Sequence, residues 1–240
     1  MTRRPLARTA LTALPLLLAA PPARGQDALP AAREILARHI QAIGGEAALR
    51  AHRSRRDVGT FAIPAQGIQG NLEVLAAAPN RVAIRIEIPG LGTVRSGYDG
   101  QVGWNIHPAT GPTLIEGRAL DQLRQQAHFY APLDHDAFIA SLETVEKTTF
   151  EGRPCYKVKV VTRWGEEYSE FYDAETGLLA GSVRQQESPM GAVEVTTVVG
   201  EYKKFGNLLM PTRVVQRAFG VEQVLTLTSS EFDQVPDDAF

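Results

Sequence analysis

The residues best suited to metal chemistry lie in one short segment, in which His128 is followed by Asp134, His135 and Asp136. Imidazole nitrogens and carboxylate oxygens are ligands for divalent ions, so this segment is the candidate site of a hydrolase or metalloenzyme. The chain has no His-Glu-x-x-His motif and no paired cysteines. A solvated loop, with Asp134 or Asp136 capping a following helix, explains the same residues. We therefore predict no metal site and no cofactor.

Neighbouring carboxylates, Glu166, Glu167 and Glu170, raise the possibility of acid/base catalysis. On a strand, Glu166 and Glu170 share one face, with Tyr168 between them. A face exposed to solvent explains this arrangement, and it is the interpretation that we favour. The chain also has no Gly-x-Ser-x-Gly motif and no phosphate-binding glycine loop. The sequence thus predicts a protein that is not an enzyme and has no catalytic residues.

Two further residues with chemical potential have structural explanations. His39 lies near the C-terminal end of a predicted helix, where an imidazolium would interact favourably with the helix dipole. Cys155 is the single cysteine, so it forms no internal disulfide. It begins an alternating strand, and we predict that it is a small, buried, apolar residue.

The N-terminal segment has the composition of a secretory signal. Three arginines occur within the first eight residues, an apolar run covers 10–20, and small residues follow up to Gly25. The run is shorter than the ~20 residues that a membrane span needs, and no second run of that length follows. We expect a signal peptide over 1–25, cleavage before Gln26, one domain over 26–240 with no transmembrane segment, and a periplasmic location.

Charge gives no indication of a nucleic-acid partner. The whole chain has a net charge of −2, and four arginines lie in the predicted signal. The remainder is therefore mildly acidic, with scattered charge and no basic patch, so we predict no nucleic-acid binding.

The elements that would position these residues are mostly strands. A helix is expected over 31–43, ended by Gly44-Gly45. Apolar residues then alternate with polar ones in two sets of strands. The predicted strands cover 58–63, 70–76, 82–88, 93–98, 102–106, 113–115 and 145–150, followed by a meander from 155 to 219 and a closing strand over 221–232. Between the sets, helical spacing over 118–142 predicts two helices separated at Pro132.

Five segments carry a family resemblance: AIGGEAAL (42–49), YDGQVGW (98–104), FEGRPCYKV (150–158), FYDAETGLL (171–179) and EYK followed by GNLLMP (201–211). In this order, the segments resemble the outer-membrane lipoprotein-sorting family, and the resemblance covers essentially the whole chain after the signal. The fold of that family is similar to that of the periplasmic lipoprotein carriers LolA and LolB. The resemblance implies a mainly β (α+β) fold, a single curved antiparallel sheet forming an unclosed β-barrel. An N-terminal helix and two inserted lid helices would accompany it.

The resemblance also implies a function, that of a periplasmic carrier binding a lipid or a lipoprotein acyl chain in a hydrophobic cavity. The expected cavity residues are Val82, Ile84, Ile86, Trp104, Val158, Val160, Phe171 and Leu178, with Leu120, Leu123 and Phe129 from the lid. Ordinary core packing is the alternative for each. The alternative function is a structural or interaction module with a filled core, binding a protein partner in the cell envelope. A void of several hundred Å³ beneath the lid would distinguish the two.

Overall fold

The computed structural model describes residues 28–188 and 191–240, so the predicted signal peptide lies outside the described residues. Three α-helices are present in the described part: α1 (Ala32–Ala42), α2 (Glu46–Arg50) and α3 (Gly117–Ala127), with 3₁₀ turns η1 (Pro64–Gln66) and η2 (His135–Ala137). The strands are β1 (Ser54–Ile63), β2 (Ile68–Ala77), β3 (Arg81–Ile88), β4 (Gly92–Tyr98), β5 (Gly103–His107), β6 (Gly111–Ile115), β7 (Ile139–Phe150), β8 (Arg153–Thr162), β9 (Glu167–Asp173), β10 (Leu179–Ser188), β11 (Gly191–Phe205), β12 (Leu208–Ala218) and β13 (Val221–Phe232). None of the described helices is long and apolar enough to cross a membrane.

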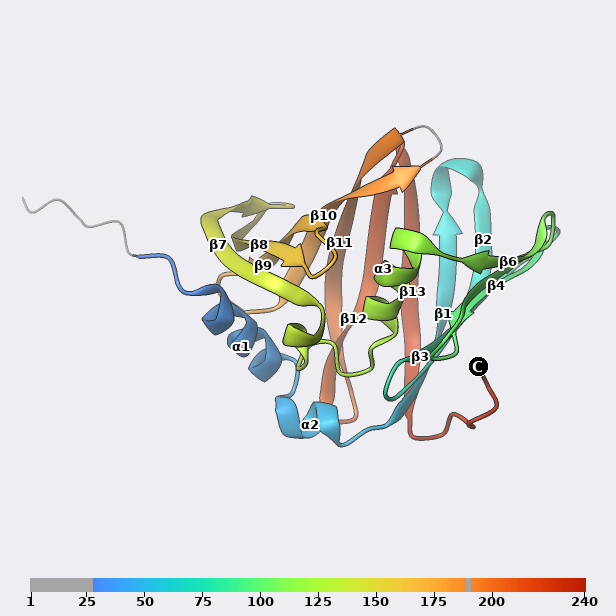
Figure 1. Ribbon diagram of the computed structural model, residues 1–240, viewed down its shortest axis with the longest axis horizontal. Helices are drawn as coiled ribbons and strands as arrows, with labels where there is room; N and C mark the ends of the chain where they lie inside the picture. The colour runs from blue at the N-terminus through green and yellow to red at the C-terminus, as the bar shows by residue number, and fades with distance from the viewer. Residues whose placement is uncertain (1–27, 189–190) are drawn as a thin grey trace, which may run out of the picture.

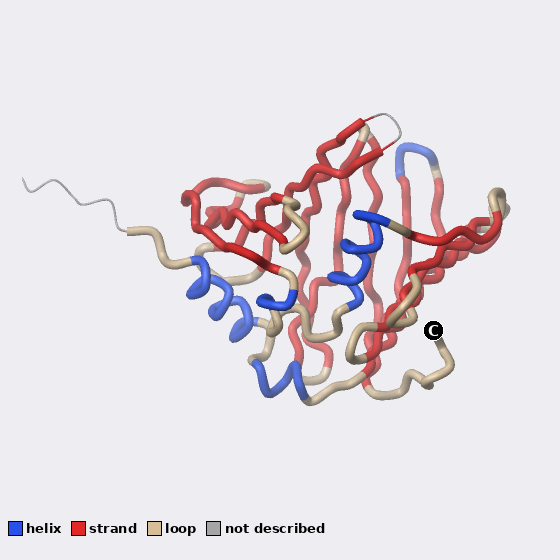
Figure 2. The backbone as a smooth tube through the Cα atoms, viewed as in Figure 1, coloured by secondary structure: helices blue, strands red, loops and turns tan. Residues whose placement is uncertain are grey.

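All the described strands form one antiparallel sheet, in the order β6-β5-β4-β3-β2-β1-β13-β12-β11-β10-β9-β8-β7. Two meanders, β1–β6 and β7–β13, are therefore joined where β1 pairs with β13. The edge strands β6 and β7 do not pair with each other, so the barrel is unclosed. Both ends of the sheet curve toward the side on which α3 lies (Figures 1 and 2). The predicted fold class is confirmed.

The connection between the two meanders must cross from one edge of the sheet to the other, because β6 and β7 are consecutive in the chain. It contains α3 and η2 and covers the concave face (Figure 1). The second predicted lid helix is wrong, since only η2 is helical after Pro132 and β7 begins at Ile139. Two irregularities in the pairing of β7 with β8 explain the error. Each extra residue in a strand shifts the alternation, so the apolar residues of β7 imitate helical spacing.

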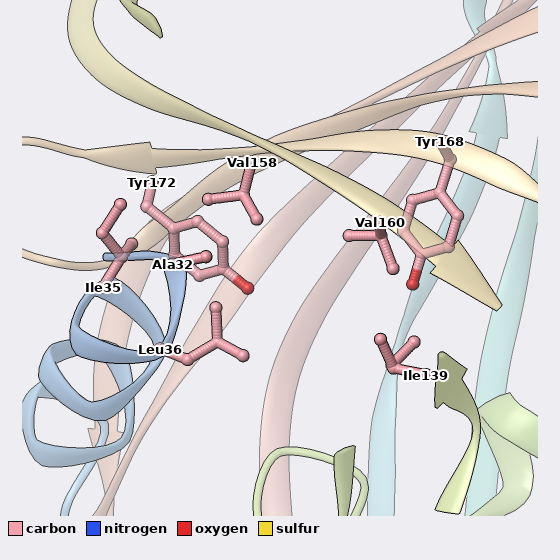
Figure 3. Packing of buried hydrophobic residues seen from close by; sticks show 8 residues of the cluster. All are labelled: Ala32, Ile35, Leu36, Ile139, Val158, Val160, Tyr168 and Tyr172. Atoms are coloured by element: carbon pink, nitrogen blue, oxygen red, sulfur yellow. The ribbon is translucent and has the colours of Figure 1, made fainter. Parts of the chain in front are cut away.

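The first hydrophobic cluster fixes α1 to one end of the concave face. Ile35 and Leu36 of α1 pack with Val158 and Val160 of β8 and with neighbouring buried residues of β7 and β9. Figure 3 shows these side chains between α1 and the strands. The N-terminal helix is thus held by burial of its apolar side.

A second cluster fixes α3 to the other end of the same face. Leu120, Leu123 and Ala127 lie three or four positions apart, which places them on one side of the helix. They pack with Val82 and Tyr98 of β3 and β4. A third cluster lies on the convex face, where Phe150, Cys155, Phe171 and Ala180 pack together. Cys155 is fully buried there, as predicted.

Candidate functional site

A cavity of about 180 Å³ lies on the concave face between α1 and α3, over β8, β9 and β10, and is partly open to solvent. Helix α3 and the segment that follows it up to Phe138, which includes η2, cover the cavity. The apolar part of the lining consists of Ala131, Pro132, Phe138, Ile139, Leu142, Val160 and Leu179. The polar part consists of His39, Gln125, His135, Tyr168, Glu170 and Tyr172. A largely apolar wall with a few converging polar groups is typical of a small-molecule site.

Hydrogen bonds hold the cover of the cavity to the second meander. Gln125 Nε2 of α3 donates to the Tyr168 hydroxyl at 3.2 Å. Gln122 Nε2 donates to Glu166 Oε1 at 3.0 Å. Because the apolar side of the same helix packs on β3 and β4, α3 bridges the two halves of the sheet. An ion pair of 2.9 Å between Arg33 and Asp136 similarly connects α1 to η2.

The side chains of β9 that face the cavity are two tyrosines flanking a glutamate. The Tyr172 hydroxyl donates to Glu170 Oε2 at 2.6 Å. Burial raises the pKa of the Glu170 carboxyl, although this hydrogen bond and the charge of Arg184 oppose the rise. The prediction that Glu166 and Glu170 face solvent is therefore wrong. Glu166 is only 4% exposed and accepts a second hydrogen bond from Trp164 Nε1.

His39 reaches the cavity from the last turn of α1. Its Nδ1 donates to the Gly177 carbonyl oxygen at 3.3 Å, and its ring meets Tyr172 edge to face. Burial lowers the pKa of His39 to about 4, so the imidazole is neutral at pH 7. The predicted imidazolium at the helix terminus is therefore wrong. Burial lowers the pKa of His135 as well, so neither histidine of the lining contributes a positive charge at pH 7.

The candidate metal ligands are dispersed among other partners. His128 Nε2 lies 2.9 Å from Asp134, which also contacts Arg50. Asp136 pairs with Arg33, and His135 lines the cavity. In the part of the chain that the structure describes, no three His, Cys, Asp or Glu side chains are grouped as a metal would require. These residues are part of the loop between α3 and β7.

The second meander supplies the predicted residues that lie at the cavity. Val160 lines it, and Val158 is buried beside Val160 in the same cluster. Leu178 lies in the turn before β10, and the next residue, Leu179, lines the cavity instead. Phe171 belongs to the convex cluster. Because side chains alternate along a strand, Phe171 cannot share the face of Tyr172, and its prediction as a cavity residue is wrong.

The first meander places the other predicted residues away from the cavity. A Cβ on Gly103 would contact Leu120 and Leu123 of α3, so the adjacent Trp104 faces the convex side, where it packs over Gly97. The prediction that Trp104 faces the cavity is therefore wrong. Val82 and Ile84 pack beneath α3 with Leu120 and Leu123, as core. Ile86 shares their face by alternation, and Phe129 follows α3, donating its N–H to the Pro79 carbonyl. None of these four residues, Val82, Ile84, Ile86 and Phe129, is among the described residues that line the cavity.

Sequence reasoning missed the polar residues of the site. Tyr168, Glu170 and Tyr172 occupy alternate positions on β9. Two aromatic residues on one face of a strand indicate burial, and this pattern was the signal that Glu170 lies inside.

The volume of the cavity limits the length of alkyl chain that it can hold. Its volume of about 180 Å³ is close to that of an engineered ~150 Å³ cavity that holds one benzene. Sites for drug-sized ligands start at ~300 Å³. The cavity therefore accommodates a small part of an acyl chain, and the rest of a longer ligand would extend through its open side or displace the segment that covers it.

Comparison with known proteins identifies the fold. No family model matches the chain, and a search of curated proteins finds no match. Among solved structures, the chain is similar to a LolA superfamily protein from Nitrosomonas europaea, with 13% identity, a TM-score of 0.59, and coverage of 88% of this chain and 98% of that one. It is also similar to a DUF1329 family protein from Desulfovibrio piger, with 10% identity, a TM-score of 0.60, and coverage of 87% and 95%.

A third structure, a domain described as an outer membrane lipoprotein-sorting protein from Vibrio parahaemolyticus, has 10% identity and a TM-score of 0.53, with coverage of 85% and 93%. These likenesses extend over nearly the whole described chain. The protein therefore has the LolA-like fold that the sequence predicted.

Proposed function

We propose that this protein is an exported, periplasmic carrier, not an enzyme, and that it binds the alkyl chain of a lipid or lipoprotein in the cavity between α1 and α3. The observation that carries the proposal is the cavity itself, an apolar space on the concave face of a LolA-like sheet. Structures with this fold include a domain described as a lipoprotein-sorting protein.

The energetics favour an alkyl ligand. Each methylene group removed from water contributes ~0.8 kcal/mol, so a few carbons against Ile139, Leu142 and Val160 offset part of the cost of ordering a ligand. Longer chains gain more, and they extend through the open side of the cavity or displace its cover. Side-chain contacts such as Gln125 with Tyr168 and Arg33 with Asp136, and the backbone hydrogen bond from Arg163 to Phe138, connect this cover to its neighbours. Breaking these contacts costs less than separating paired strands.

The direct test is binding of an uncharged apolar probe, N-phenyl-1-naphthylamine, to the purified and delipidated chain. Saturable fluorescence enhancement, reversed by an added alkyl ligand, is the expected result. Leu142→Trp places a larger side chain in the cavity lining and should weaken probe binding at least fivefold. Mass spectrometry of an organic extract of the undelipidated protein should identify the natural ligand.

The matched control is Val198→Trp, which adds a similar volume beside the convex cluster. It should leave probe affinity unchanged within twofold. If the folded, delipidated chain shows no saturable binding, the carrier proposal is wrong and the interaction module becomes the better interpretation. If both variants weaken binding equally, the probe binds elsewhere.

A further inference from the structure

The polar residues that line the cavity can form more hydrogen bonds than the described protein groups provide. Within the described part of the chain, Glu170 has one hydrogen-bonded oxygen, Oε2, which accepts from Tyr172. No partner is present there for Oε1. Glu170 is half-buried and lines the cavity. Its Oε1 can therefore accept a hydrogen bond from a ligand in the cavity, and a ligand that donates to it would gain affinity.

Two neighbouring groups offer the complementary roles. The Tyr168 hydroxyl accepts from Gln125, which leaves its own hydrogen to donate. His39 uses Nδ1 as a donor to Gly177, which leaves Nε2 as an acceptor. Figure 3 shows the hydroxyl groups of Tyr168 and Tyr172 pointing toward the side of Leu36 and Ile139, with Val158 and Val160 between the two rings. Donor and acceptor groups thus adjoin an apolar surface.

The same wall offers little to a charged head group. No lysine or arginine is among the described residues that line the cavity. The nearby Arg184 guanidinium lies over the Tyr168 ring, 4.4 Å from its centre, and 3.7 Å from Glu166. An anion would therefore meet the Glu170 carboxyl with no lysine or arginine in the lining to offset its charge. A cation would meet the positive charge of Arg184, which already acts on Glu170.

We propose that the cavity selects an uncharged amphiphile, whose hydroxyl-bearing head group hydrogen-bonds Glu170 and Tyr168 while its alkyl chain lies against Ile139, Leu142 and Val160. This inference rests on the proposed function and specifies its ligand class. Glycerol monoesters and long-chain alcohols have the required chemistry. Fatty-acid anions and alkylammonium ions do not.

The test compares twelve-carbon ligands, below their micellar concentrations, as competitors for N-phenyl-1-naphthylamine on the delipidated chain. We expect 1-monolauroylglycerol to bind at least tenfold more tightly than laurate or dodecylammonium. Methyl laurate, which is uncharged but has no donor, should bind between these extremes. This comparison needs no variant.

Substitutions of Glu170 then test whether this side chain causes the preference for an uncharged ligand that bears hydroxyl groups. Glu170→Leu should weaken 1-monolauroylglycerol about tenfold and leave methyl laurate unchanged, whereas Glu170→Gln, which keeps a donor and an acceptor, should retain most of the affinity. Glu167→Leu is the matched control, because Glu167 is exposed on the opposite face of the same strand and should change neither ligand.

The outcomes separate the inference from the proposed function. Equal or tighter binding of laurate or dodecylammonium overturns the selectivity but leaves the carrier proposal intact. An unchanged ligand preference in Glu170→Leu refutes the role of this carboxyl. Absence of any probe binding removes the proposed function, and the inference with it.

Discussion

The buried imidazole of His39 should make the protein sensitive to mild acid. The pKa of His39 is about 4 in the folded chain, against ~6.5 in an unfolded one. Between these values the unfolded chain binds a proton that the folded chain does not, so stability falls as the pH is lowered through this window. Each pKa unit corresponds to ~1.4 kcal/mol. The full effect is therefore about 3 kcal/mol, with about 2 kcal/mol already lost at pH 5.

The comparison with His39→Gln isolates this effect, since glutamine can still donate to the Gly177 carbonyl and cannot titrate. Urea unfolding followed by tryptophan fluorescence at pH 7.5, 6 and 5 gives the free energy of unfolding. The unmodified chain should lose about 2 kcal/mol more than the variant between pH 7.5 and pH 5. Aspartates with lowered pKa values, such as Asp134 and Asp233, titrate at lower pH and affect both proteins alike.

Equal pH dependence of the two proteins would refute the reasoning. It would mean that the His39 side chain is accessible to water in the folded state, and hence that α1 does not cover this end of the sheet as tightly as described. A larger loss in the variant would reverse the sign of the effect and would have the same consequence.

Three further substitutions and one control substitution probe packing. Ile84→Ala should lower the free energy of unfolding by about 2 kcal/mol without changing probe affinity, because Ile84 packs beneath α3 outside the cavity; altered affinity in a folded variant would contradict this placement. Gln122→Leu removes a donor from the buried carboxylate of Glu166 and should cost about 1–3 kcal/mol, measured by urea unfolding. Gly59→Ala would put a methyl group against a backbone carbonyl of β13 and should lower the melting temperature sharply, whereas Gly200→Ala, which has open space, should not.

Local sequence patterns were sufficient to predict two helices and one buried residue of the convex cluster. The glycines after α1 and the helical spacing of Leu120 and Leu123 predicted α1 and α3 correctly. Cys155 was correctly predicted as buried. The spacing of apolar residues wrongly predicted a helix at the start of β7. The bulges in this strand arise from its pairing with β8, and the sequence of β7 alone does not indicate them.

The site was less predictable than the fold. The alternation in β8 and β9 separates two faces but does not say which one is concave. As a result, Phe171 and Glu170 were assigned to the wrong sides, whereas Val160 lies in the lining of the cavity. Which face lies inside depends on the helix that packs against it, and α1 is more than 100 positions away in the chain.

The sequence by itself determined most of the strands and hairpins, because alternation and turn residues act between neighbours in the chain, and the family resemblance indicated that they form a single curved sheet. Only the tertiary structure decided that β1 pairs with β13, that the segment between β6 and β7 crosses the concave face, and that His39 and Glu170 meet at one cavity. These contacts join residues distant in sequence. Burial between two packed elements, which neither element provides alone, lowers the pKa of His39 and raises the pKa of Glu170.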